Sequence, residues 1–533
     1  DLCDAAVDAA VLQSTDQPDR YTFAHALIEH TLYDGLSPAR RSRAHYAVAE
    51  ALEAMLGDDP GERAAELAYQ WAAAVQPTDM SKAIRYAQLA GQRALDQLAP
   101  EEAVRWFGQA LDMLNRSTTP DPRRRIEVLI GLGTAQRQHG VSEFRETLLE
   151  AARLADADDH VDLFVRATIS NHRGWNSLSG ATDHERIDAI DRALERLDHS
   201  DTPERVRLLT ISASERIYSA DVEDRRSRAK AAVAAARRSG DRGALAMSLT
   251  ASYSAVVAPD TVSMCTEWST EACEIGDELR DPGIRIQARM IAAACALQRG
   301  DRDALEHHSA VYQEVVEQAP FAAWRWLAIA YRVPFEIVRG EIEEAERFAE
   351  AALVYGNENG QPDALTIFGA ELVNIRYHQG RYEDILPLIE RALVDSPDLP
   401  VYAAVFVHGL ARTGQLDRAR EVLDEHLASD LAVPLNVQWV AGQVCWAEAA
   451  CLTGSTAVAE RVRERLVPYP DQMATTIMTV QPAIAHYLGM IDHLLGRLDD
   501  GDRWFARAAA VQERFDAPLL NAYTQASWAS LLA

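Results

Sequence analysis

Residues 298–304 read QRGDRDA, a junction at which a glycine separates two helix-forming stretches. Similar junctions follow at Gly340, Gly380, Gly414, Gly454 and Gly496. Counted from Gly300, the intervals between them are 40, 40, 34, 40 and 42 residues. Glycine readily adopts the left-handed backbone conformation that ends many helices. Because the flanking stretches are rich in Ala and Leu, the repeated unit predicts two antiparallel helices joined by a tight turn.

An acidic residue often follows the glycine by three positions. Asp303, Asp417 and Asp499 stand at this place, and we expect them to cap the second helix by accepting its unpaired amide hydrogens. One helical hairpin cannot bury its own apolar face, so neighbouring hairpins must stack into a superhelix. The predicted fold class is therefore all-α, an αα-hairpin solenoid.

Small residues at characteristic spacings make this repeat resemble the tetratricopeptide repeat (TPR) family. The segment 82–114 matches the pattern with Gly91, Ala103, Phe107 and Ala110. The last repeat matches it with Leu488, Gly489, Gly496, Phe505 and Ala508. The middle repeats match less completely, through Ala345, Ala352 and Ala419. Their spacing near 40 exceeds the usual TPR length and implies longer helices or longer connections.

Composition restricts the function further. The chain has 533 residues, more than one compact core usually organises. Its 81 acidic and 53 basic residues give a net charge of −28, which repels nucleic-acid phosphates. The six cysteines form no CxxC pair and no apolar stretch is long enough to span a bilayer. We therefore expect a cytoplasmic protein that binds neither nucleic acid nor membrane.

The first 56 residues follow a different pattern. A helical stretch at 2–12 precedes two short extended runs, 11–14 and 21–23, which flank a polar turn. A further helix is expected to begin near His25. A helix, a β-hairpin and another helix are typical of the end of a winged-helix domain, so a small partial winged-helix segment is predicted here.

The run from Tyr21 to His45, YTFAHALIEHTLYDGLSPARRSRAH, resembles the winged-helix end of STAND-type signalling ATPases. That group includes MalT-like and LuxR-family regulators and ATPase-coupled adenylate cyclases. In it, a nucleotide-binding domain precedes the winged helix and a TPR-like arm follows. The resemblance implies a sensor and relay arm that controls an attached output domain. It also implies that ATP or ADP binds an upstream ATPase domain, with no cofactor in this chain.

The resemblance also assigns a role to one residue. His25 stands where related ATPases have a histidine that contacts the β-phosphate of bound ADP. An imidazole N–H can donate to a phosphate oxygen. The chain departs from its relatives at Ala26, where plant and animal proteins have an acidic residue, and at Glu29, where bacterial ones usually have Arg. The alternative is a structural histidine packed beside Phe23.

Four parts are predicted along the chain: the winged-helix end at 1–56, first repeats at 57–118, degenerate repeats at 119–300 and TPR-like repeats at 301–533. Within the degenerate part, TDHE at 182–185 has the spacing of a capping box and predicts a helix through Leu197. The polar stretch 171–180 is either a functional loop or a plain connection.

One aromatic and cationic cluster is a candidate partner-binding site, formed by Trp324, Arg325, Trp326, Tyr331 and Arg332. On the concave face of a superhelix, such side chains can clasp a peptide or a small anion. The partner would then be a protein or a small-molecule effector in the groove. Large aromatic residues at helical spacing are also typical of inter-helix packing, which is the alternative.

No catalytic motif stands out in the sequence. A GxxxxGK[ST] phosphate loop, HExxH, GxSxG and an EF-hand loop are all missing, and His307 and His308 are adjacent, which suits no metal. We predict neither catalysis nor metal binding by this chain. The main alternative to a relay arm is a free-standing TPR scaffold for protein binding, and an unrecognised enzyme ranks after it. DNA binding through Arg40, Arg41 and Arg43 conflicts with the overall acidity.

Overall fold

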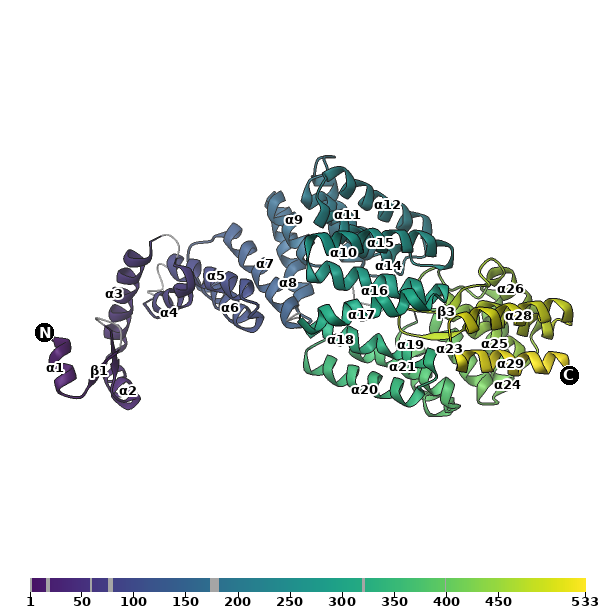
Figure 1. Cartoon of the computed structure of the whole chain (residues 1–533). Helices are drawn as coiled ribbons and strands as arrows, with labels where there is room; N and C mark the ends of the chain where they lie inside the picture. Colours follow the sequence, from purple (N-terminus) through teal and green to yellow (C-terminus); the bar gives the residue numbers. More distant parts are fainter. Residues whose placement is uncertain are drawn as a thin grey trace. The chain divides into compact units, whose positions relative to one another are not determined.

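The computed structural model describes residues 2–15, 20–57, 60–74, 80–172, 182–318, 322–397 and 399–533. The regular secondary structure of the described residues is helical apart from two short β-hairpins (Figure 1). The chain divides into two compact units, the first ending at Asn171 and the second beginning at His172. Residues 173–180 of the predicted functional loop lie outside the described residues. The all-α fold class is confirmed.

Unit 1 begins with the predicted order of elements. Helix α1 (Leu2–Asp8) leads to strands β1 (Leu12–Ser14) and β2 (Tyr21–Phe23), which pair antiparallel, and then to α2 (Ala26–Asp34). The helices that follow are α3 (Pro38–Leu56), η1 (Gly61–Arg63), α4 (Ala64–Ala74), α5 (Ser81–Asp96), α6 (Pro100–Arg116), α7 (Pro122–His139), α8 (Phe144–Ala157) and α9 (Val161–Ser170). From α3 to α9 each helix packs on the next along the chain, as in stacked helical hairpins.

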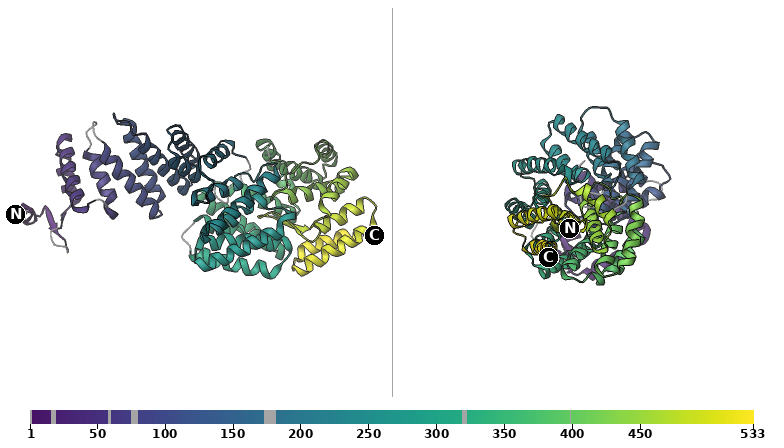
Figure 2. Two further views of the ribbon diagram at one scale, coloured as in Figure 1. Left: turned by 90° about the horizontal axis from the view of Figure 1, so that it is seen from above. Right: turned by 90° about the vertical axis from the view of Figure 1, so that its right-hand side faces the viewer.

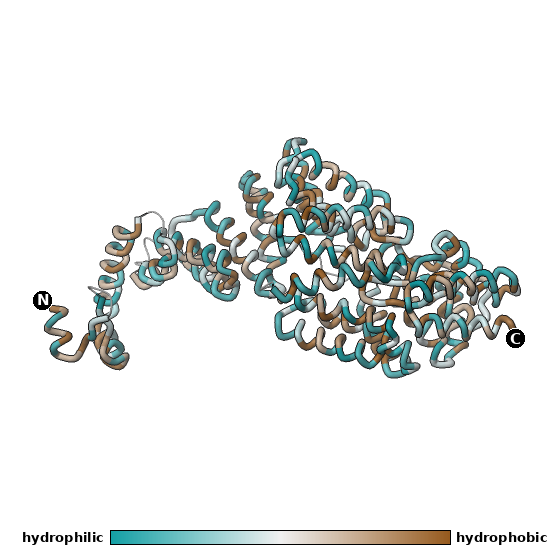
Figure 3. Tube along the Cα trace, in the orientation of Figure 1, coloured by the Kyte–Doolittle hydropathy of each residue, from teal (hydrophilic) through white to brown (hydrophobic). Residues whose placement is uncertain are grey.

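Unit 2 continues the helical hairpins. Its elements are α10 (His184–Arg196), α11 (Pro203–Ser214), α12 (Val222–Ser239), α13 (Arg242–Ala251), α14 (Tyr253–Val256), η2 (Pro259–Thr261), α15 (Val262–Leu279), α16 (Pro282–Arg299), α17 (Arg302–Gln318), α18 (Ala322–Ala330), α19 (Arg332–Arg339), α20 (Ile342–Glu358), α21 (Ala364–Gln379), η3 (Tyr382–Asp384), α22 (Leu386–Asp395), α23 (Val401–Arg412), α24 (Leu416–Ala428), α25 (Trp439–Thr453), α26 (Thr456–Leu466), β3 (Met473–Thr475), β4 (Val480–Ala483), α27 (Ile484–Leu494), α28 (Leu498–Arg514) and α29 (Pro518–Leu532). Apolar and polar residues alternate along most helices (Figure 3), since each has one packed and one exposed face.

Glycine and phenylalanine make the close contacts expected of TPR-like packing. A Cβ atom on Gly91 would stand 2.8 Å from the ring of Phe107, and one on Gly489 would stand 2.8 Å from the ring of Phe505. In both pairs the phenylalanine follows the glycine by sixteen positions. A Cβ on Gly131 would also collide with Phe107. The chain is therefore a TPR-like helical-repeat protein in both units.

All six junction glycines confirm the turn prediction. Their φ values are positive, from 61° at Gly300 to 84° at Gly340, in the left-handed region that glycine adopts without steric cost. Four of the helices that precede them have the glycine itself as the cap residue in this conformation, and the caps of the other two, Thr413 and Leu495, stand directly before the glycine. The period read from the sequence therefore corresponds to real helix ends.

The predicted capping residues are wrong by two positions. A single residue separates each of these glycines from the next helix, so Asp303, Asp417 and Asp499 lie inside the first turn. The cap of α17 is Asp301, whose carboxylate accepts the amide hydrogen of Ala304 at 3.2 Å. The cap of α10 is likewise Asp183 and not the predicted Thr182.

Removing the cap of α17 tests this correction. We expect Asp301→Ala to destabilise the start of α17 by about 1 kcal/mol, because the Ala304 amide loses its acceptor. Asp303→Ala is the matched control, and should cost about 0.3 kcal/mol through the helix dipole alone. Native-state hydrogen exchange of the first amides of α17 measures both. Equal protection in the two variants would contradict the assignment.

Earlier and later segments of unit 2 are bonded to each other. The Arg225 guanidinium donates to the Leu435 carbonyl at 2.6 Å, and the Gln472 amide donates to the Pro259 carbonyl at 2.8 Å. Arg302 pairs with Asp516 at 3.2 Å. Each bond links residues more than 200 positions apart. The later part of unit 2 therefore packs against its earlier part, and helix α29, in yellow in Figure 2, contacts α19.

Candidate binding sites

His25 is a helix cap at the surface of unit 1. Its backbone is extended, with φ of −150°, and its Nδ1 accepts the amide hydrogen of Leu27 at 3.2 Å. Because Nδ1 is the acceptor, the proton of the neutral ring sits on Nε2. Nε2 has no partner among the described residues, and the side chain is exposed. The contact of His25 with a nucleotide phosphate stays a prediction.

The N-terminal elements of unit 1 lack a core. Among the described residues, none before His45 is buried. Six large apolar side chains of these elements are exposed, and together we call them the N-terminal apolar surface: Leu2, Tyr21, Phe23, Leu27, Leu32 and Tyr33. Leu27 is 71 % exposed and Leu32 53 %. A two-stranded hairpin without a packed face is marginally stable in water, so this surface suits contact with another protein surface.

A hydrogen-bonded chain joins α2 to the first repeat. The Tyr33 hydroxyl lies 2.9 Å from Nε2 of His45, whose Nδ1 lies 2.6 Å from the Gln70 side-chain oxygen. Ser42 donates to the Ala74 carbonyl at 3.0 Å. Because the side-chain carbonyl oxygen of Gln70 can only accept a hydrogen bond, Nδ1 of His45 carries the proton and Nε2 of His45 accepts from the Tyr33 hydroxyl. Side-chain hydrogen bonds thus link helices α2, α3 and α4.

The arginines that suggested DNA binding are partly engaged within unit 1. Arg41 donates through Nε to the Leu36 carbonyl at 3.0 Å and pairs with the Asp34 carboxylate at 3.7 Å. Its guanidinium also lies 4.9 Å from the centre of the Tyr33 ring. This side chain therefore stabilises the turn between α2 and α3.

The structure separates the aromatic residues of the predicted partner site by depth. Trp326 and Tyr331 are buried, with exposures of 1 % and 2 %, and belong to the core of unit 2. Trp324 is half-buried against the same core. Gly356 lets the Trp326 ring pack closely, since a Cβ there would stand 2.8 Å from Nε1. As placed, Trp326 and Tyr331 hold helices together and offer no surface to a partner.

The two arginines of that cluster have different surroundings. Arg325 is exposed and donates weakly to the Glu317 carbonyl at 3.4 Å. Arg332 lies 4.4 Å from the centre of the Phe348 ring and donates to Glu336 at 2.7 Å. The structure therefore brings these five predicted residues to one region without forming a single open site from them.

The interior of unit 2 is filled by its own chain. Met473 and Val480 of the β3–β4 hairpin are fully buried. The Val480 amide donates to the Asn374 side chain at 3.1 Å, and the Ala483 amide donates to the Gln512 side chain at 3.0 Å. The hairpin contacts α16, α19, α25, α27, α28 and α29. The hairpin is therefore part of the core of unit 2.

A buried charged cluster lies among the inner helices of unit 2, centred on Glu448 of α25. One carboxylate oxygen lies 3.2 Å from Nε2 of His408 and accepts the Tyr377 hydroxyl at 3.2 Å. The other lies 3.3 Å from Nε of Arg412. The His408 Nδ1 lies 3.3 Å from the Tyr382 hydroxyl. One carboxylate therefore faces two bases.

The electrostatics of the cluster follow from this pairing. Burial by itself would raise the pKa of Glu448, but the charges of His408 and Arg412 outweigh it and hold that pKa at about 2. Burial by itself would lower the pKa of His408, but the carboxylate raises it to about 9. Burial lowers the pKa of the neighbouring His486 to about 4. At neutral pH the centre is a protonated histidine, a carboxylate and a guanidinium.

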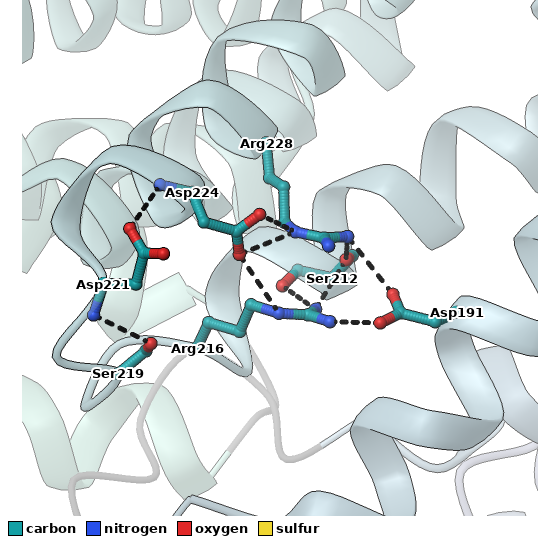
Figure 4. Close-up of polar contacts among 7 residues, drawn as sticks. All are labelled: Asp191, Ser212, Arg216, Ser219, Asp221, Asp224 and Arg228. Carbon is teal, nitrogen blue, oxygen red and sulfur yellow. Dashed lines mark hydrogen bonds and ion pairs between the residues drawn. The ribbon is translucent and has the colours of Figure 1, made fainter.

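A second polar network ties α10, α11 and α12 together (Figure 4). Arg216 and Arg228 each pair with both Asp191 and Asp224, at distances from 2.5 to 3.7 Å. Both guanidinium groups also donate to the Ser212 hydroxyl. Two positive and two negative charges neutralise each other here, so this network is suited to holding helices and not to binding an ion.

No group of metal ligands forms within the described ranges. His307 and His308 both approach Arg289, whose terminal nitrogen lies 3.3 Å from one ring and 3.2 Å from the other. The guanidinium thus occupies the position at which two histidine rings could share an ion. In the part of the chain that the structure describes, no helix is both long and apolar enough to cross a bilayer.

Sequence reasoning missed the Glu448 cluster, although a signal existed. Glu448 is the only charged residue in the fifteen of α25, and a lone charge on an apolar helix is usually paired inside the protein. His408 and Arg412 lie four residues apart and so share one face of α23. The partner across the helices could not be read from either segment.

Comparison with known proteins identifies no family. No protein-family model matches this sequence, and no curated protein matches it. Three solved structures that resemble the fold are yeast Tom70, a Rap protein complexed with competence and sporulation factor, and a circular tandem repeat protein. Yeast Tom70 has a TM-score of 0.33 and 13 % identity, over 85 % of this chain and 97 % of that one.

The other two structures are no closer. The Rap protein has a TM-score of 0.29 and 10 % identity, over 81 % of this chain and 98 % of that one. The circular tandem repeat protein has a TM-score of 0.14 and 14 % identity, over 96 % of this chain and 90 % of that one. Similarity at this level carries no information on function.

Proposed function

We propose that this chain is the binding and relay arm of a STAND-type regulatory ATPase. In this proposal the helical repeats bind a protein or small-molecule effector. The N-terminal segment docks on a nucleotide-binding domain, and the two events together control an output domain. A transcription factor, a nucleotide cyclase or a kinase could be that output.

The observation that carries the proposal is the missing core of the N-terminal elements. The N-terminal apolar surface is exposed on α1, β2 and α2, none of which has a fully buried residue. Burying a side chain such as Leu27 against a partner contributes about 2 kcal/mol. Such a surface is more stable in contact with a folded domain than exposed to water.

The position of His25 supports a nucleotide as the signal. The cap fixes its ring through Nδ1 and leaves the Nε2 proton for an acceptor outside the chain. A phosphate oxygen is such an acceptor. Helix α2, which follows His25, is hydrogen-bonded through Tyr33 and His45 to Gln70 of the first repeat. A displacement of α2 would therefore move the first helices of the repeat array. Relay by this route needs only that the effector bind the two states with different affinity.

Bound nucleotide in the protein expressed from its complete reading frame tests the proposal. Purified wild type is denatured and the released ADP is quantified, then His25→Ala and His30→Ala are treated in the same way. His30 lies on the same helix and is also exposed, so it is the matched control. We expect retained ADP in wild type and in His30→Ala, and a loss of most of it in His25→Ala.

Two results would contradict the proposal. Absence of nucleotide from wild type would leave a free-standing TPR scaffold for protein binding as the better account. Equal ADP in the two histidine variants would remove His25 from the phosphate site.

A further inference from the structure

Charge is nearly absent from three helices of unit 2. Helices α23, α25 and α29 contain only one Lys or Arg, Arg412, and one Asp or Glu, Glu448. The acidity of the chain is carried by other helices. A buried ion pair contributes little to stability compared with apolar packing, so the presence of this one on such apolar helices suggests a role beyond packing.

Arg412 differs from its two partners in being open to solvent. Its side chain is 31 % exposed, while those of Glu448 and His408 are 6 % and 2 % exposed. Its Nε faces the Glu448 carboxylate at 3.3 Å, and its guanidinium lies 4.6 Å from the centre of the Tyr377 ring. The two terminal nitrogens make no hydrogen bond in the described part of the chain. The group is therefore held on one edge and one face, with its outer edge unoccupied.

Glu448 is in turn fixed from the other side. His408 and the Tyr377 hydroxyl both contact its second oxygen, so the carboxylate cannot turn away from Arg412. Tyr523 of α29 stands beside Tyr377, with ring centres 5.8 Å apart. Burial raises the pKa of the Tyr523 phenol and the nearby Arg412 charge partly offsets this. The Tyr377 ring therefore contacts both the Arg412 guanidinium and the Tyr523 ring.

We propose that the outer edge of Arg412 is a binding site for an oxyanion, a carboxylate or a phosphate group. A planar guanidinium offers two parallel N–H donors that match such groups. Because Glu448 and Tyr377 fix the orientation in advance, little side-chain freedom remains to be lost on binding. The Glu448 carboxylate thus positions the Arg412 guanidinium for recognition. Together with the protonated His408, these groups carry one net positive charge. This site is independent of the nucleotide switch proposed above.

Direct titration with two probes tests the site. Binding of succinate is followed by saturation-transfer NMR, and binding of inorganic phosphate by ³¹P line broadening. Sodium chloride keeps the ionic strength constant, because the chain is strongly acidic and screening changes its field. Wild type is compared with Arg412→Gln, Arg412→Lys and the control Arg391→Gln. Arg391 is 76 % exposed on α22 and pairs only with its neighbour Asp395.

We expect wild type and Arg391→Gln to bind one probe with equal affinity. Arg412→Gln should weaken that binding about tenfold or more, and Arg412→Lys should weaken it as well, because an ammonium lacks the two-donor edge. The probe that binds distinguishes carboxylate from phosphate recognition. Circular dichroism checks that each variant is folded, and if Arg412→Gln is not, Arg412→Lys decides. No binding by wild type, or binding by Arg412→Lys equal to wild type, would overturn the proposal.

Discussion

Replacing Glu448 by glutamine is expected to lower the free energy of unfolding of unit 2 by about 3 to 5 kcal/mol. The carboxylate is 6 % exposed and has His408 and Arg412 as ionic partners. Its removal leaves the buried His408 ring and the partly exposed Arg412 guanidinium without their counter-charge. Urea denaturation followed by far-ultraviolet circular dichroism measures the change. Glu460→Gln is the control, since that carboxylate is 58 % exposed and pairs with Arg497 at the surface.

The control should change the stability by less than about 1 kcal/mol. A similar effect of the two substitutions would mean that the buried pair does not hold these helices.

The same pair predicts a dependence on pH. The pKa of His408 is raised from 6.5 to about 9, so its contribution is complete below pH 6.5 and is lost as the pH rises through 9. The pKa of Glu448 is lowered from 4.5 to about 2, so its contribution is complete above pH 4.5 and is lost as the pH falls through 2. Wild type should therefore lose stability between pH 6.5 and 9, and Glu448→Gln should lose much less over that range.

Replacing Phe107 by alanine is expected to destabilise unit 1 by about 3 to 5 kcal/mol. The ring is 2 % exposed and lies against Gly91 and Gly131. Because neither glycine has a side chain, nothing can move into the vacated space, and the cost should lie at the upper end. Hydrogen exchange read by mass spectrometry measures it on peptides from α5 to α7.

Two references accompany this variant. Peptides from α27 and α28 should keep their exchange rates, since Phe505 fills the corresponding place in unit 2. Met55→Ala, a change at a 75 % exposed side chain, should cost less than about 0.5 kcal/mol. Unchanged protection of α5 to α7 in Phe107→Ala would show that the glycine–phenylalanine contact does not organise the repeat.

Short-range features were predictable because they depend on a few neighbouring residues. The left-handed turn at Gly300 and its five successors follows from the absence of a Cβ atom. The hairpin of Leu12–Ser14 with Tyr21–Phe23 and the helix after His25 follow from extended residues around a polar turn. The predicted cap at Asp303 was wrong by two residues, because the sequence did not show how many residues connect Gly300 to the next helix.

The candidate sites were predictable only in part. His25 was placed correctly at the start of a helix, yet its use as a cap depends on the backbone angle adopted there. Trp326 and Tyr331 were recognised as a cluster, but their burial depends on Gly356 and on other helices packed over them. A pattern of aromatic residues is the same whether it faces a groove or a core.

The sequence by itself determined the repeat, its turns and the helical class, since these follow from local backbone preferences and from the spacing of small residues. Only the tertiary structure decided that Glu448 meets His408, that Arg225 reaches Leu435, and that the β3–β4 hairpin fills unit 2. These contacts join segments from 40 to more than 200 residues apart. Which residues meet depends on the cumulative rotation between successive helical hairpins. That rotation adds up over many repeats, so it cannot be read from a short stretch of sequence.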